Sequence, residues 1–95
     1  MEISTQTNII LITGNIKSIS DFQTIKQSTD AVVKNHKNIT LKILDSLSMT
    51  SSVIGYLNKL VLKDEIQINM QIGNEQLMNL LRDLNLISTF NVKSV

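Results

Sequence analysis

Four side chains are of types that commonly take part in reactions. They are the serine pair Ser51 and Ser52, the aspartate Asp45 after an apolar run, and the only histidine, His36. Together these residue types could in principle form a Ser-His-Asp triad. However, no serine lies in the Gly-x-Ser-x-Gly motif of a nucleophile elbow. We therefore expect no enzymatic activity. The pattern favours helix capping by the serines, a loop role for Asp45 and a helix-end role for His36.

Metal, cofactor and nucleic-acid sites are not indicated. The chain has no cysteine, and its one histidine and scattered carboxylates lack the spacing of a metal site. The glycine-rich loops that hold phosphates of nucleotides are absent, so we expect no cofactor. The formal net charge is +1, with basic residues spread along the chain and few aromatic side chains. A nucleic-acid interface would need a concentrated basic face, so none is expected.

The length of 95 residues allows one domain, residues 1–95. The first residues do not resemble a signal peptide, and no apolar run approaches the ~20 residues needed to span a bilayer. We expect a soluble, cytoplasmic protein without direct membrane insertion.

Hydrophobic periodicity in the first half predicts strand, helix and strand. Residues 8–13 form a β-branched run before Gly14, and residues 2–5 form a possible hairpin partner for it. Ser18 and Ser20 are candidate caps of a helix that ends near residues 35–37. Residues 39–45 predict the next strand. One face of the helix carries Phe22, Ile25, Thr29, Val32 and Val33.

The second half repeats this alternation. A helix is predicted from Ser51, with Ile54, Leu57, Leu60 and Val61 at helical spacing. Strict apolar–polar alternation over residues 66–72 predicts a strand with one buried face. Asn74 is the expected cap of a last helix, and residues 89–92 predict a short final strand. The apolar stripe of that helix comprises Leu77, Leu80, Leu81, Leu84 and Ile87.

The resulting element order, β(β)αβαβαβ, predicts an α/β fold. Strands that alternate with helices over short connections are typical of parallel pairing through right-handed crossovers. We expect a mostly parallel or mixed sheet of four to five strands, with the helices mostly on one face.

Three segments, in this order, resemble the STAS family, which includes the bacterial anti-sigma-factor antagonists. Residues 11–16, Leu-Ile-Thr-Gly-Asn-Ile, are similar to the end of that family's first long strand. Residues 44–56 are similar to the segment that opens its second helix, typically Asp-Ser-Ser/Thr-Gly-Leu-Gly. Residues 79–87 and then 89–92 are similar to its later helix, Leu-x-x-Leu-Leu-x-x-x-Gly-Leu, and short strand.

The resemblance implies a STAS-like fold and a protein-binding regulatory switch in transcription. In that family a partner serine kinase, acting as an anti-sigma factor, phosphorylates a serine at this helix start and the complex separates. Ser51 matches that serine best and Ser52 is the second candidate. Thr50 replaces the family's preceding Asp, Val53 its Gly, and Lys17 stands at or near its acidic residue. The implied partner-binding residues are Asp45, Ser48, Thr50, Val53, Ile54 and Tyr56, the apolar ones if exposed.

The resemblance leaves a second function open. STAS-like single domains also serve as accessory subunits bound to the permease of ATP-binding cassette transporters that move lipids. Such a subunit needs no phosphorylation, so Thr50 in place of Asp is compatible with it. A structural subunit of a larger sensory complex would use the same surface.

Overall fold

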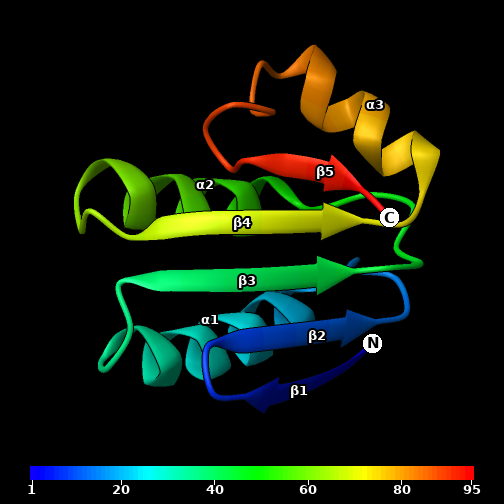
Figure 1. Ribbon diagram of the computed structural model, residues 1–95. Helices are drawn as coiled ribbons and strands as arrows, with labels where there is room; N and C mark the ends of the chain where they lie inside the picture. The colour runs from blue at the N-terminus through cyan, green and yellow to red at the C-terminus, as the bar shows by residue number, and fades with distance from the viewer.

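The computed structural model describes all residues from 1 to 95 and contains a five-stranded sheet and three helices (Figure 1). The expected α/β order is confirmed, including the additional first strand. The elements are β1 (Glu2–Gln6), β2 (Ile9–Thr13), α1 (Ile19–Val33), β3 (Asn38–Ile43), α2 (Ser51–Leu62), β4 (Gln67–Ile72), α3 (Glu75–Asp83) and β5 (Val92–Ser94).

The strands lie side by side in sequence order, β1-β2-β3-β4-β5. β1 pairs antiparallel with β2, whereas β2 to β5 are parallel, so their carboxyl ends share one edge of the sheet (Figure 1). A chain that moves in one direction through right-handed crossovers places all its helices on one face. The register agrees, because Ile10, Leu41, Met70 and Val92 align across four strands and all are buried.

The two faces of the sheet therefore differ. The helices cover the face whose side chains belong to a single core of 22 buried residues. The opposite face carries no helix and presents polar residues such as Thr40, Lys42, Asn69 and Gln71, which are partly exposed. This arrangement explains the alternating pattern over β3 and β4. The three helices include no candidate transmembrane span.

Each helix begins at a residue whose side chain accepts a backbone hydrogen bond. Ser18 caps α1 in a capping box with Asp21, and Asn74 caps α3, as the sequence predicts. Hydrogen bonds from the backbone N–H groups of Lys17 and Ser18 hold the pKa of Asp21 below its ordinary value, against the smaller effect of desolvation. The cap of α2 is Thr50, so the expectation that Ser51 or Ser52 caps this helix was wrong.

The last third of the chain departs from its predicted boundaries. The stripe from Leu77 to Ile87 suggested a longer helix, but α3 ends at Asp83 and Asn85 has a φ of 59°. A residue in the left-handed region ends a helix because continuation requires negative φ. The following turns delay the final strand, which begins at Val92 and not at Thr89.

Gly73 directly follows β4, at a point where the loop after β3 approaches it closely. Its N–H donates to Ile43 O at 3.0 Å, and a Cβ added there would lie 2.3 Å from Leu44 O. Only glycine fits this contact without displacing the loop after β3. Gly55, an exposed residue of α2, is a contrasting case, since a Cβ there would meet no atom within 4 Å.

We predict that Gly73→Ala lowers the free energy of unfolding by about 1–3 kcal/mol, because the methyl group must displace backbone. The matched variant Gly55→Ala should raise stability by up to about 1 kcal/mol, since alanine favours the helix. Urea unfolding followed by circular dichroism measures both. Equal stability changes in the two variants would contradict the close approach at Gly73.

Candidate functional site

The candidate site lies at the carboxyl edge of the parallel strands, where the segment after β3 runs into α2. This segment, residues 44–50, is held against residues 14–17, which follow β2. The Gly14 N–H donates to Asp45 Oδ1 at 2.8 Å, and the Leu47 N–H donates to Asn15 Oδ1 at 2.9 Å. The two loops therefore form a single hydrogen-bonded unit.

Ser46 is the buried centre of this unit. Its side chain is fully buried, and its Oγ accepts a hydrogen bond from the Ile16 N–H at 3.0 Å. The same hydroxyl donates to Ser48 O at 2.6 Å. One side chain thus satisfies backbone groups of both loops and fixes the course of the chain into α2.

Both candidate serines lie at the start of α2. Ser51 and Ser52 are its first two residues, and both are exposed. Neither hydroxyl takes part in a hydrogen bond. The side chain that caps α2 is that of Thr50, whose Oγ1 accepts from the Val53 N–H at 3.3 Å. The serine hydroxyls are therefore accessible at a helix N-terminus that does not depend on them.

Ser52 differs from Ser51 in its surroundings. It lines a shallow hollow of about 130 Å³ between the N-termini of α1 and α2, together with Lys17, Ile19, Phe22 and Thr50. The ammonium of Lys17 belongs to neither of the chain's two ion pairs. A free cation and a free hydroxyl therefore border the same hollow.

The other predicted partner-binding residues differ in their exposure to solvent. Asp45 and Ser48 are exposed, and Thr50 and Ile54 are half-buried. Asp45 uses one carboxylate oxygen to hold Gly14, as its expected loop role requires.

Val53 and Tyr56 are buried in the core, so the expectation of apolar partner contacts is corrected for both. Their spacing with Leu57 and Leu60, at i, i+3, i+4 and i+7, is the sequence signal of a buried helical face.

Tyr56 joins α2 to α1 instead. Its hydroxyl donates to Asp30, whose other oxygen pairs with Lys26 Nζ at 3.0 Å. The Phe22 ring packs edge-on, with its centroid 6.3 Å from that of Tyr56. Desolvation and the bond to Asp30 raise the pKa of Tyr56. For Asp30, desolvation acts upward, but the bonds from Tyr56 and Lys26 outweigh it and lower the pKa.

Sequence reasoning missed several residues that form this site. Asn15 and Ser46 were missed because their roles depend on two loops that meet only in the folded chain. Ile19 and Leu47 are large apolar side chains exposed by 77% and 45% at this end of the molecule. Ile19 had a detectable signal, because it follows the cap Ser18 and lies off the buried face of its helix.

We predict that Ser46→Ala costs about 1–3 kcal/mol of stability, because it leaves the buried Ile16 N–H without a partner. Ser48→Ala is the matched control, since that side chain is exposed and makes no hydrogen bond; its effect should stay within about 0.5 kcal/mol. Chemical denaturation measures both variants. A Ser46→Ala protein as stable as the control would show that the bridge contributes nothing.

Acid should weaken the contact between α1 and α2. Because the folded-state pKa of Asp30 is lowered, its stabilisation is present above the unfolded pKa of about 3.9 and is lost as the pH falls through the folded value. Asp30→Asn should therefore lose less stability than the wild type between about pH 5 and pH 2. Urea midpoints across this range test it, with the unpaired exposed Asp83→Asn as control. Parallel pH profiles for wild type and Asp30→Asn would refute it.

Comparison with known proteins gives no match: no protein-family model matches the chain, and neither the curated proteins nor the solved structures include a significant match.

Proposed function

We propose that the chain is a STAS-like regulatory domain that binds a partner protein at the start of α2 and is switched by phosphorylation of Ser51 or Ser52. The proposed partner is a serine kinase that acts as an anti-sigma factor. The observation that supports this proposal best is the exposure of both hydroxyls in the first turn of α2, free of hydrogen bonds.

The position suits a switch that leaves the fold intact. The kinase would transfer the terminal phosphoryl group of ATP: the serine Oγ–P bond forms, the bond to ADP breaks, and the hydroxyl proton passes to a kinase base. The product adds about −1.5 to −2 charge at pH 7. The first turn of a helix stabilises negative charge, and Thr50 would continue to cap α2. Only the surface presented to the partner would change.

The surrounding side chains fit a protein-binding surface. We define the switch surface as Lys17, Ile19, Leu47, Thr50, Ser51 and Ser52. Ile19 and Leu47 are exposed apolar side chains that can be buried in a complex. The loop that carries Leu47 is held in place by Asn15 and Ser46, which lowers the entropy lost on binding.

The same surface could act without phosphorylation in an accessory subunit bound to the permease of a lipid transporter. Thr50 favours this alternative, because a threonine cap replaces the acidic residue that precedes the modified serine in the resembling family. The two functions differ in how binding responds to charge at the serines, and one experiment separates them.

The test is capture of partners from native cells with the tagged chain in three forms. One form is unmodified, one carries genetically encoded phosphoserine at 51 or 52, and one carries it at Ser88, which is exposed and lies outside the switch surface. We expect a protein kinase to bind the unmodified and Ser88-modified forms, with at least tenfold weaker binding when Ser51 or Ser52 is modified.

The outcomes are distinct. A permease captured equally by all forms would support the transporter role and end the switch proposal. A kinase bound equally by all forms would also refute control at the serine pair. Intact-mass analysis after incubation of the unmodified chain with the captured kinase and ATP then identifies the modified residue. Replacing that serine with alanine should abolish the added phosphoryl mass.

A further inference from the structure

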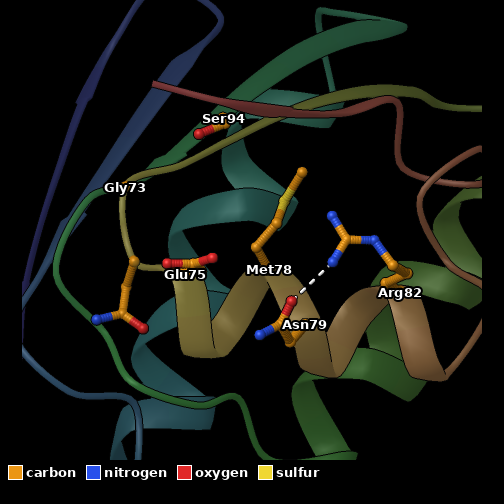
Figure 2. A pocket seen from close by; sticks show the side chains of 7 residues that line it. Gly73, Glu75, Met78, Asn79, Arg82 and Ser94 are labelled. Atoms are coloured by element: carbon orange, nitrogen blue, oxygen red, sulfur yellow. Dashed lines mark hydrogen bonds between the residues drawn. The ribbon is translucent and has the colours of Figure 1, made fainter.

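A second surface lies between α3 and the free edge of β5. The structure contains a hollow of about 350 Å³ there, bordered by the α3 residues Glu75, Met78 and Arg82 and by Gly73 and Ser94. Figure 2 shows Glu75 and Arg82 on the two sides of Met78, with Ser94 across the hollow on β5. We call this hollow the edge groove. It shares no residue with the switch surface.

Backbone groups of β5 are unpaired beside the groove. β5 is an edge strand, bonded only to β4. Val95 N donates to Ile72 O at 3.0 Å, so in the parallel ladder the odd-numbered residues Lys93 and Val95 turn their backbone groups toward β4. Val92 and Ser94 therefore turn theirs outward. The Val92 N–H donates to Ile87 O. The Val92 C=O, the Ser94 N–H and the Ser94 C=O therefore remain available for hydrogen bonds to a partner.

Opposite charges lie at the two ends of the edge groove. Arg82 is the only arginine of the chain, and its Nη1 donates to Asn79 Oδ1 at 2.7 Å without an ion pair to any carboxylate. Its remaining guanidinium donors suit a carboxylate, which Arg binds with two parallel hydrogen bonds. Glu75 lies seven residues earlier on α3, roughly 10 Å away along the helix axis. The groove thus has a cationic end and an anionic end.

We propose that the edge groove binds an extended peptide segment of a partner protein, which adds to β5 as a sixth strand. Strand addition at an exposed sheet edge beside a helix is an established mode of peptide recognition. The segment would carry an acidic side chain toward Arg82 and a basic one toward Glu75. An apolar side chain between them would contact Met78.

A short peptide fits this surface better than a second copy of the chain. Only three backbone groups of β5 are open, and all lie within the three residues Val92–Ser94. A stable protein dimer buries about 800 Å² on each partner, far more than such a stretch provides. The expected interaction is correspondingly weak, with a dissociation constant on the order of 0.1–1 mM for an isolated peptide.

The test uses two blocked peptides, acetyl-Glu-Thr-Val-Thr-Lys-amide and its reverse, acetyl-Lys-Thr-Val-Thr-Glu-amide, so that either strand direction is sampled and the central valine shares a face with both charged side chains. Titration into the ¹⁵N-labelled chain should shift the amide signals of Ser94 and of α3. The same peptide with N-methylated backbone amides should bind at least tenfold more weakly, because strand pairing needs those donors.

Matched variants locate the contact. Ser94→Pro removes an N–H that β4 does not use, so the fold should persist while affinity falls at least tenfold. Ser94→Ala retains the N–H and should bind within about threefold of the wild type. Arg82→Gln should weaken the preferred peptide about three- to tenfold. Amide spectra of the free variants verify folding.

Three results would overturn the proposal. The first is no binding of either peptide at 5 mM, about five times the weakest expected dissociation constant. The others are equal affinity for the N-methylated peptide and signal shifts confined to β1. A concentration-dependent dimer that Ser94→Pro abolishes, without peptide binding, would assign the edge to a second copy and also reject it. None of these outcomes bears on the serine pair, so the switch is tested separately.

Discussion

The hydroxyl of Ser46 is the contact on which the carboxyl edge of the sheet depends. It accepts from Ile16 and donates to Ser48 at a site without solvent access, so both loops must adopt one conformation to satisfy it. Asp45 and Asn15 then fix the backbone on either side. Through this bridge the chain enters α2 at a defined position, and the first turn of α2 is presented in a fixed orientation.

The single helical layer is unusual for parallel strands, which are generally covered on both faces. Here the second face is viable because the residues that β3 and β4 present on it are polar, although Ile9 and Leu11 of β2 also lie on this face. Asn38 and Asn69, for example, join neighbouring strands through a side-chain hydrogen bond of 2.7 Å. The two proposed binding surfaces therefore lie away from the helix-covered core, one at the β5 edge of the sheet and one at the carboxyl ends of the parallel strands.

Much of the fold could be predicted from the sequence because the physical signals were local. Apolar and polar residues alternate from Ile66 to Ile72 because successive side chains of a strand point to opposite faces. The caps Ser18 and Asn74 each accept a hydrogen bond from the first turn of the helix that follows them. The end of α3 was mispredicted because Leu84 and Ile87 extend the apolar stripe, whereas backbone geometry at Asn85 ends the helix.

The candidate site was less predictable. The serine pair was found because its position depends on the boundary of one helix. The bridge by Ser46 and the support from Asn15 were not found, since each joins segments about thirty residues apart. Val53 and Tyr56 were named as partner contacts on condition that they were exposed, because a short apolar segment fits more than one helical phase. Contacts between α1 and α2 determine that phase.

The contact of Tyr56 with Asp30 has a practical consequence. The chain has one tyrosine and no tryptophan, so its near-ultraviolet absorption and emission come almost entirely from this phenol. Because the ring lies between α1 and α2 and its hydroxyl faces a carboxylate, any rearrangement of the two helices alters that signal. The native protein therefore contains its own optical probe of the helix pair beside the serines, and needs no added label.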